Sequence, residues 1–289
     1  MKTDKFLVRE GSKRDLKKHP TDFTGDYTDK EKALKDLEKN IKRIGELQDI
    51  MYAQDEQSLL IVFQAMDAAG KDSTIEHVMT GINPQGCSVV SFKQPSSEEM
   101  DHDFLWRCTK AVPERGKIGV FNRSHYEEVL VVRVHPEILM GQKLPAKVKT
   151  DKKIWQKRFG QIRNFEDNLA ENGTQIVKFF LHVSKEAQKK RFLDRIEQPD
   201  KNWKFRSGDA KERALWDDYM NAYVDAMRNT STANAPWYVI PADRKWFMRL
   251  AVSQVIVDKL EAMKLAYPIV SEAEKADLAE AKRLLESEI

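Results

Sequence analysis

The chain has 289 residues, of which 41% are hydrophobic and 33% charged, with a formal net charge of +3. The composition is typical of a globular protein with a densely charged surface, and the length allows one large α/β domain with insertions or two small domains. No apolar run approaches the ~20 residues of a membrane span, and the N-terminal segment lacks the apolar core of a signal peptide. The cysteines, Cys87 and Cys108, lack metal-ligand spacing and fit a reducing compartment. We therefore expect a cytoplasmic protein with no zinc site, no disulfide and no membrane partner.

The first 57 residues are predicted to form a polar arm and a long helix. Residues 1–28 are polar and carry a basic cluster at Lys13, Arg14, Lys17 and Lys18, which is typical of a solvated surface. From residue 29 to 54 the apolar positions recur at three- and four-residue steps. This spacing predicts an amphipathic helix that packs across the sheet that follows.

Five apolar segments predict strands, at residues 58–63, 88–92, 117–121, 175–183 and 237–240. Helices are expected from residue 71 onward, at 97–109, at 185–198, at 214–228 and at 245–264. Strands that alternate with helices indicate a parallel sheet, and the ligand crevice of such a sheet lies at the carboxyl ends of its strands. We therefore expect residues 64–71, 93–96 and 122–126 to converge there.

The predicted organisation has three parts. Residues 1–57 form the arm and the long helix, and residues 58–267 form the core, which includes a basic lid at about 141–213. Residues 268–289 form a charged C-terminal helix that we expect to pack on a neighbouring subunit.

The segment from Leu59 to Met79 has the order strand, tight loop and helix that a phosphate-binding loop requires. It matches the pattern GxxxxGK[ST] imperfectly, because Ala65 replaces the first glycine and Asp72 replaces the hydroxyl residue. Asp67 lies inside the loop, where a carboxylate beside phosphate makes sense if a divalent cation lies between them. The alternative is an ordinary strand–turn–helix unit with a surface lysine.

Phosphoryl transfer needs donors that hold the phosphates, a metal ion and fixed positive charge. Lys71 would reach the reacting phosphates, Asp67 would help to hold Mg²⁺, and Arg123 would contact the transferred group. The candidate phosphate-binding residues are Ala68, Ala69, Gly70, Asp72, Ser73, Thr74 and Arg133. No covalent intermediate is implied, and we expect His125 and His135 to have structural or hydrogen-bonding roles.

Two basic segments are candidates for a lid over a phosphate-rich substrate. Residues 143–163 contain about eight lysines and arginines against one acid, and residues 199–213 are also basic. A charge run is usually a solvated face, but the first run directly follows the third strand, which favours polyanion binding. The candidate residues are Lys143, Lys149, Lys152, Lys153 and Arg206.

Three segments together closely resemble the polyphosphate kinase 2 family: AMDAAGKDSTI, FNRSHYEEVLVVRVHP and PADRKWFMRLAV. The AMDAAGKD form is most similar to class III members. The resemblance implies an α/β P-loop kinase fold, similar to thymidylate kinase, in which the five-stranded parallel sheet is flanked by helices and carries a helical basic lid. It also implies Mg²⁺ dependence and a homo-oligomer, either a dimer or a tetramer.

The same resemblance implies transfer of phosphate from inorganic polyphosphate to nucleotides, from AMP to ADP and from ADP to ATP, with guanine nucleotides as further acceptors. Asp67, Lys71 and Arg123 match the family's loop aspartate, loop lysine and strand-end arginine. The family's second essential aspartate, a metal ligand with Asp67, falls on Asn122. An amide cannot act as an anionic ligand or as a base. The chain is either a naturally weakened member or, as we favour, carries an Asp→Asn change that traps a substrate complex.

Two other functions are compatible with parts of the pattern. A nucleoside or nucleotide kinase with a nucleoside triphosphate donor would share the fold and the loop, but it would need fewer cations than a polyphosphate chain. A nucleic-acid-binding protein would use the same basic surface, yet it predicts aromatic side chains between the charges. Residues 143–163 offer little beyond Trp155 and Phe159, and this function leaves Asp67 unexplained. We expect no nucleic-acid partner.

Overall fold

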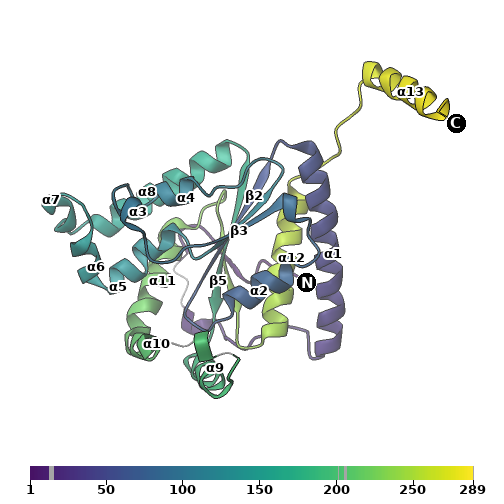
Figure 1. Ribbon diagram of the computed structural model, residues 1–289. Coiled ribbons are helices and arrows are strands. Elements are labelled where there is room, and N and C mark those ends of the chain that lie inside the picture. Colours follow the sequence, from purple (N-terminus) through teal and green to yellow (C-terminus); the bar gives the residue numbers. More distant parts are fainter. Residues whose placement is uncertain (13–15, 201, 205–206, 289) are drawn as a thin grey trace.

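The computed structural model describes residues 1–12, 16–200, 202–204 and 207–288. Within these residues a six-stranded sheet is flanked by helices on both faces (Figure 1). The strand order is β1-β6-β5-β2-β4-β3. The strands are β1 Leu7–Val8, β2 Ser58–Ala65, β3 Cys87–Ser91, β4 Ile118–Asn122, β5 Thr174–His182 and β6 Trp237–Pro241.

Strands β2 to β6 pair in parallel, which confirms the five predicted strands and their orientation. The arm adds β1, which pairs antiparallel with β6 at the edge of the sheet. A strand of two residues leaves no alternation of apolar and polar positions, so the sequence pattern could not indicate it.

The helices form two layers. Helices α1, α2 and α12 lie on one face of the sheet, and α8 and α11 lie on the other (Figure 1). The α-helices are α1 Lys30–Gln54, α2 Lys71–Val78, α3 Ser97–Met100, α4 Trp106–Thr109, α5 Val131–Val134, α6 Pro136–Gly141, α7 Ala146–Lys149, α8 Ile154–Glu171, α9 Lys185–Glu197, α10 Ser207–Glu212, α11 Trp216–Thr230, α12 Lys245–Ala262 and α13 Glu272–Glu286. Short 3₁₀ turns are η1 Leu16–Lys18, η2 Pro84–Gly86, η3 His125–Val129, η4 Asn202–Lys204 and η5 Arg213–Leu215. No helix in the described part of the chain is long and apolar enough to cross a membrane.

Helix α1 confirms the predicted amphipathic helix. The side chain of Asp29 accepts a hydrogen bond from the backbone of Glu31 and caps the helix start, where such a cap typically contributes about 1 kcal/mol. Residues Ala33 and Leu37 pack against Leu250 of α12, and Ile44, Leu47 and Met51 join the main core. The helix therefore lies along α12, and it contributes to the core beneath the sheet through its C-terminal half.

The predicted helix at 97–109 is wrong in its middle. The structure has two short helices, α3 and α4, separated at residues 101–105. Asp103 Oδ1 accepts a hydrogen bond from the backbone N–H of Leu105 at 2.9 Å. A short acidic side chain that bonds to nearby backbone competes with the helical hydrogen-bond ladder, so the helix ends and restarts there.

Strand β2 lies between β4 and β5, and all eight of its residues are buried. A parallel strand covered by helices on both faces requires a nearly continuous apolar sequence, which Ser58–Ala65 supplies. The loop that follows β2 therefore begins from the most enclosed strand of the sheet. This strand fixes the position of the loop relative to the neighbouring strand ends.

A buried polar cluster supports the turn that follows β4. Lys178 of β5 places its Nζ 2.5 Å from Glu166 Oε2 and 2.9 Å from the hydroxyl of Tyr126. The hydroxyl of Tyr126 donates to Glu166 Oε1 at 2.8 Å. His125 is buried beside the same carboxylate, with Nε2 3.4 Å from Oε1. His125 therefore has the structural role expected of it, since it helps to hold η3 against β5 and α8.

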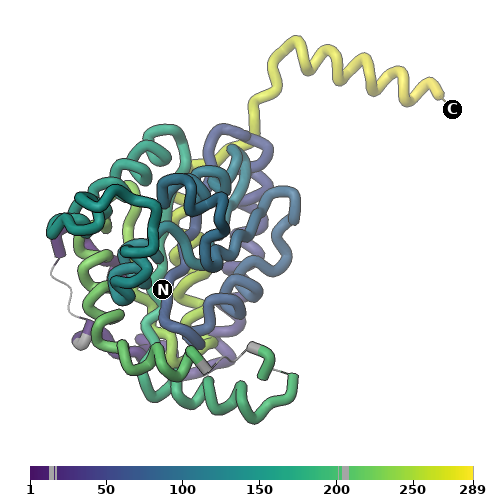
Figure 2. Tube along the Cα trace, turned by 60° about the vertical axis from the view of Figure 1, so that its left-hand side comes forward, coloured from purple at the N-terminus to yellow at the C-terminus, as the bar shows by residue number. Residues whose placement is uncertain are grey.

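The predicted lid range must be corrected. Strand β5 and helix α8 lie within residues 141–213, and both belong to the layers of the core. Only the flanking segments, residues 141–153 and 198–213, remain candidates for a lid. The C-terminal helix α13 stands away from the rest of the chain (Figure 1 and Figure 2), and all its described residues are exposed.

Candidate active site

The loop between β2 and α2 turns sharply at Ala68 and Gly70, whose φ angles are 58° and 107°. The backbone N–H of Ala69 donates to the carbonyl of Met66 at 3.2 Å and closes the turn. A positive φ favours glycine because L side chains crowd the backbone there. A Cβ atom at Gly70 would also lie 3.2 Å from the side chain of Met248. The backbone geometry therefore requires the glycine of the predicted phosphate-binding loop.

The N-terminus of α2 points its backbone N–H groups out of the helix without a side-chain cap. The first N–H groups of a helix have no acceptor within the helix and can bind an anion. The hydroxyls of Ser73 and Thr74 both donate to the carbonyl of Gly70, at 3.2 and 2.8 Å. These hydroxyls are therefore turned into the helix, and the backbone N–H groups of Lys71, Asp72 and Ser73 are left for a ligand.

Lys71 folds back over the end of β2. Its Nζ donates to the carbonyl of Ala65 at 2.9 Å. Burial lowers the pKa of Lys71, and the carboxylate of Asp67 opposes this effect. The lysine thus places its Nζ against the backbone of the loop, and its contact with the reacting phosphates stays a prediction.

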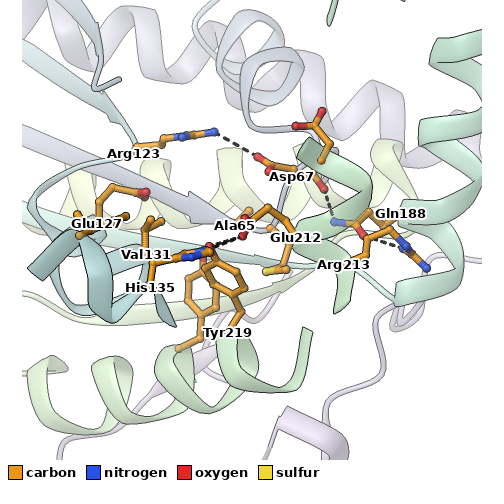
Figure 3. Close-up of a pocket in the computed structure, with 14 residues that line it drawn as sticks. Ala65, Asp67, Arg123, Glu127, Val131, His135, Gln188, Glu212, Arg213 and Tyr219 are labelled. Atoms are coloured by element: carbon orange, nitrogen blue, oxygen red, sulfur yellow. Dashed lines mark hydrogen bonds and ion pairs between the residues drawn. The ribbon is translucent and has the colours of Figure 1, made fainter. Parts of the chain in front are cut away.

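The end of β4 brings two predicted residues to the loop. Residue Asn122 is the register partner of Phe63 in β2, and the next N–H, that of Arg123, donates to the Phe63 carbonyl at 3.0 Å. The φ of Arg123 is 64°, and its Nη2 lies 3.2 Å from Asp67 Oδ1 (Figure 3). The amide of Asn122 donates to Asp72 Oδ1 at 2.6 Å. Two strand ends and the start of α2 are therefore joined through side chains.

Two residues of α9 hold the loop in place, and the sequence analysis missed both. Gln188 donates to the carbonyl of Asp67 at 2.8 Å. Arg191 Nη1 donates to the carbonyls of Ala68 and Ala69, at 3.0 and 2.8 Å. The loop carbonyls face α9 because these side chains bind them. In the sequence these two residues form a polar pair three residues apart on a helix that follows a predicted strand. That spacing is common on surface helices, so it does not indicate a contact with the loop.

A cavity of about 310 Å³ opens beside Asp67 and Arg123 (Figure 3). Four carboxylates line it, together with two arginines, one histidine and two tyrosines. The lining residues are Ala65, Met66, Asp67, Arg123, Glu127, Val131, His135, Ile138, Gln188, Asp209, Glu212, Arg213, Tyr219 and Tyr223. The cavity is thus partly acidic and partly aromatic.

The charges of Glu127 and Arg123 shift each other's pKa. Burial raises the pKa of Glu127, and Arg123 and Lys71 oppose that effect. Burial acts to lower the pKa of Arg123, but the carboxylates of Glu127 and Asp67 outweigh it and raise the pKa. Perturbed groups that share a cavity are typical of functional sites, although structural ion pairs produce them as well.

A contact on the cavity wall joins two separate segments. Nε2 of His135, between α5 and α6, lies 3.0 Å from Glu212 Oε2 of α10, and the hydroxyl of Tyr219 donates to the same oxygen at 2.8 Å. Nδ1 of His135 lies 3.0 Å from Glu137 Oε1. Burial acts to lower the pKa of His135, but Glu212 and Glu137 outweigh it and raise the pKa. The prediction of a hydrogen-bonding role for His135 agrees with this geometry.

Several predicted residues do not line the cavity. Arg133 pairs with Asp225 of α11, with 2.7 Å between Nη2 and Oδ2. Lys143 pairs with Asp101, and Lys149 donates to the carbonyl of Met140. The remaining lysines, Lys152 and Lys153, are exposed next to α8.

Two further parts of the chain were predicted from the sequence to lie at the site. Residues 93–96 follow the edge strand β3, which is two positions from β2, and they do not line the cavity. The backbone N–H of Phe92, directly before this segment, donates to the carbonyl of Asn122 at 3.1 Å, so the segment begins beside the end of β4 at the same edge of the sheet. The ends of β2 and β4 line the cavity, and a role of residues 93–96 at the ligand stays a prediction. Arg206 falls outside the described residues.

The donor set near the loop can be compared with the needs of Mg²⁺. Within the described ranges, no group of three or more His, Cys, Asp or Glu side chains is placed to hold a metal ion. Mg²⁺ is usually held by one or two carboxylates, with waters and substrate phosphates in the other positions. Asp67 supplies one carboxylate in the loop, and Asp72 and Asn122 lie together beside it. The residues present therefore fit an ion that the substrate helps to bind.

Comparisons with known proteins agree on one family. A family model described as Polyphosphate kinase 2 matches residues 27–268. The chain is 52% identical over 285 residues to the ADP-polyphosphate phosphotransferase of Rhodopseudomonas palustris, with 99% of each chain covered. It is 44% identical over 265 residues to the AMP/ADP-polyphosphate phosphotransferase of Meiothermus ruber, covering 91% of this chain and 95% of the relative. The crystal structure of Polyphosphate Kinase 2 from Arthrobacter aurescens TC1 matches with a TM-score of 0.84 and 41% identity, over 94% of this chain and 95% of that chain.

Proposed function

This chain belongs to the polyphosphate kinase 2 family, and we propose that it transfers phosphate from inorganic polyphosphate to nucleoside mono- and diphosphates. The acceptors would be AMP and ADP, with guanine nucleotides as further acceptors. One observation carries the proposal: Lys71, Arg123 and the uncapped start of α2 meet at the carboxyl end of β2, beside a cavity. The substrates named for the two relatives support the donor and acceptors.

Direct in-line transfer would need no covalent intermediate on the protein. The N–H groups of Lys71, Asp72 and Ser73 would hold the phosphates of one substrate. The ammonium of Lys71 and the guanidinium of Arg123 would stabilise the charge on the transferred group, since fixed donors act most strongly where water is excluded. The Asp67–Arg123 ion pair would keep the guanidinium in position before the substrates bind.

The cavity is the better place for the nucleotide. Its volume of about 310 Å³ is at the lower end of the ~300–1,000 Å³ typical of small-molecule pockets. Tyr219 and Tyr223 offer flat apolar faces to a base, and Glu127 and Glu212 offer acceptors for its amino groups. The four carboxylates disfavour a long polyanion there, so the exposed lysines Lys152 and Lys153 remain candidates for the polyphosphate chain, together with Lys143 and Lys149.

We propose Mg²⁺ as the cofactor. Asp67 would hold the ion, together with the residue at position 122 when that residue is an aspartate. An ion held by these residues would supply positive charge against the phosphate oxygens during transfer. In this chain the amide of Asn122 instead donates a hydrogen bond to the carboxylate of Asp72.

The decisive experiment restores the carboxylate with Asn122→Asp. Long-chain polyphosphate, Mg²⁺ and AMP, ADP or GDP are supplied, and the products are separated by chromatography. We expect turnover with ADP to rise on the order of 100-fold, the usual effect of one electrostatic group at a transition state. Asn122→Ala is the matched control, because it also removes the hydrogen bond from the side-chain amide to Asp72 but adds no charge.

Two outcomes would contradict the proposal. Equal rates for Asn122→Asp and the parent chain would remove position 122 from the site. Activity of Asn122→Asp with ATP as the donor, and none with polyphosphate, would favour an ordinary nucleotide kinase.

We further propose that the chain acts in the cytoplasm as a homo-oligomer, either a dimer or a tetramer. Both cysteines are free thiols, which supports a reducing compartment. The exposed leucines of α13 support self-association, since an apolar helix face outside the core usually packs on a partner. They are Leu278, Leu284 and Leu285. Light scattering after size-exclusion chromatography measures the assembly directly.

A further inference from the structure

A second cavity lies between the N-terminal arm and the carboxyl ends of β5 and β6. Its volume is about 200 Å³. Its lining includes Lys5, Phe6, Lys18, His19, Phe23 and His182. We call this cavity the arm pocket. It is separate from the cavity beside the loop, with which it shares no lining residue.

The arm pocket has a positive lining. Lys5 and Lys18 contribute two ammonium groups, and no aspartate or glutamate is among its described lining residues. The Nζ of Lys5 is 4.7 Å from the ring centre of Phe23 and 5.4 Å from that of Phe6, so the aromatic faces orient this cation. Lys18 is exposed at the rim. A ligand of this pocket is therefore expected to be an anion.

One acid that acts on His182, Asp243, is already engaged by other groups. Asp243 Oδ1 accepts from the backbone N–H of Ser184 at 2.8 Å, and Oδ2 accepts from the hydroxyl of Thr21 at 2.6 Å. Both carboxylate oxygens are thus used to attach the arm to the sheet.

His182, the last residue of β5, supplies the most specific feature of the pocket. It is 8% exposed, and its Nδ1 is buried without a hydrogen-bond partner. The ring is also hydrogen-bonded to the backbone of His19, and burial lowers its pKa to about 4. A neutral imidazole that donates through one nitrogen accepts through the other. A buried acceptor without a donor costs about 1–3 kcal/mol, so a group that brought an O–H or N–H to Nδ1 would recover that cost.

We infer that the arm pocket binds a phosphate group that keeps a P–OH, with the P–OH donating to Nδ1 of His182 and the charged oxygens facing Lys5 and Lys18. Both requirements are met by orthophosphate near pH 7, because each of its ions there carries negative charge and at least one P–OH. Sulfate has the same shape and charge but no O–H. Inner groups of a polyphosphate chain lack a P–OH as well, whereas its terminal groups can carry one.

The size of the pocket agrees with a single phosphate group. A volume of about 200 Å³ lies below the ~300–1,000 Å³ of pockets that enclose drug-sized ligands. It leaves room for an oxyanion and a few waters, each of which occupies ~30 Å³ in the liquid. A whole nucleotide is larger than this volume suggests for the ligand.

The first experiment is equilibrium dialysis with radiolabelled orthophosphate at about pH 7. Two variants test the pocket: His182→Gln can keep the bond to the backbone of His19 but removes the acceptor at Nδ1, and Lys18→Ala removes one rim charge. Lys35→Ala on the exposed face of α1 is the charge-matched control. The phosphate-binding loop is unchanged in all variants, so its own binding cancels in the comparison.

We expect orthophosphate affinity at the pocket to fall about 10-fold in His182→Gln, to fall several-fold in Lys18→Ala, and to stay unchanged in Lys35→Ala. Unlabelled sulfate should displace the phosphate at least about 10-fold less well than unlabelled orthophosphate does. Binding that is equal in the parent chain and in both pocket variants would overturn the inference. Equal displacement by sulfate would overturn the role of the P–OH.

A second measurement covers the risk that a change at a buried histidine disturbs folding. The imidazole signals of the parent chain are followed by NMR during titration with orthophosphate, and Lys18→Ala serves as the folded reference. The signal that is missing from His182→Gln should shift with phosphate and not with sulfate. An unmoved signal at saturating phosphate would contradict the inference.

Competition separates the two sources of such a phosphate. If long-chain polyphosphate displaces labelled orthophosphate in proportion to its number of chain ends, the pocket accepts terminal phosphates. If it does not, the pocket accepts free orthophosphate alone. Either result supports the site, while displacement in proportion to total phosphate, regardless of chain ends, would overturn recognition of the P–OH.

Discussion

The phosphate-binding loop and the arm pocket lie at the carboxyl edge of the same sheet, and both place cations there, but their carboxylates differ. At the loop, Asp67 faces Arg123 and Asp72 faces the amide of Asn122. At the arm pocket, both oxygens of Asp243 are bound by structural donors. Carboxylates that face phosphate require a metal between them, whereas the described lining of the arm pocket contains two lysines and no carboxylate. The difference therefore separates a site suited to transfer from one suited to binding.

Arg191 connects the two regions. Its Nη1 binds the carbonyls of the loop, and its Nη2 donates to the carbonyls of Ala242 and Asp243, at 2.6 and 3.0 Å. The N–H of Ala242 in turn donates to the carbonyl of His182 at 2.9 Å. One guanidinium thus holds the backbone of the loop and the backbone beside the arm pocket.

The largest expected effect in this comparison is that of Arg191→Met. The variant loses four hydrogen bonds, and at about 1 kcal/mol for each we expect the free energy of unfolding to fall by about 4 kcal/mol. We also expect a lower kcat in the Asn122→Asp background and weaker orthophosphate binding, because both backbone segments lose their common support. Urea unfolding, the chromatographic assay and dialysis measure the three effects.

Lys190→Met is the matched control, since Lys190 is the exposed neighbour on α9. Loss of stability with normal kcat and normal phosphate binding would break the proposed link between the regions.

The next effect in size concerns the acid stability of the arm pocket. The pKa of His182 is about 4, below its ordinary value of 6.5. The unfolded chain therefore takes up a proton near pH 6.5 that the folded chain does not accept until about pH 4. The contribution of this ring to stability is complete above about pH 6.5 and is lost as the pH falls toward 4, to a total of about 3 kcal/mol.

Urea unfolding at a series of pH values tests this expectation against His182→Gln, which should lack that part of the pH dependence. Identical pH profiles for the two chains would show that burial of His182 does not hold the ring neutral.

The smallest effect involves the other cavity and has the opposite sign. The pKa of His135 is raised above 6.5 by Glu212 and Glu137 despite burial. The contact between His135 and Glu212 is therefore fully formed below about pH 6.5 and weakens as the pH rises through the raised pKa. Because both side chains are partly exposed, at 20% and 35%, we expect less than about 1 kcal/mol.

Hydrogen exchange of the α10 amides, corrected for intrinsic rates, measures this contact between about pH 6 and pH 8. Protection should decrease with rising pH in the parent chain and stay flat in His135→Gln. A flat profile in both would show that the ion pair does not hold α10 against the cavity wall.

The sequence by itself determined the five parallel strands and the loop between β2 and α2, because buried strands and tight glycine turns leave short, local patterns. The loop pattern and the strand ends also pointed to Asp67, Lys71 and Arg123, whereas Asn122 was assigned to the site through the resemblance to the family. The edge strand β1 and the break between α3 and α4 were missed, since two residues show no period and a side chain that competes with the helix is a local geometric event.

Only the tertiary structure decided which side chains complete each region. Gln188 and Arg191 bind the loop from 121 to 123 residues away, and no spacing along the chain indicates a partner at that distance. The unpartnered Nδ1 of His182 depends on how the arm folds over β5 and β6, so a lone histidine at a strand end could not reveal it. The burial that shifts these pKa values arises from packing between distant segments, which is why the chemistry of single residues was readable in the sequence and their protonation was not.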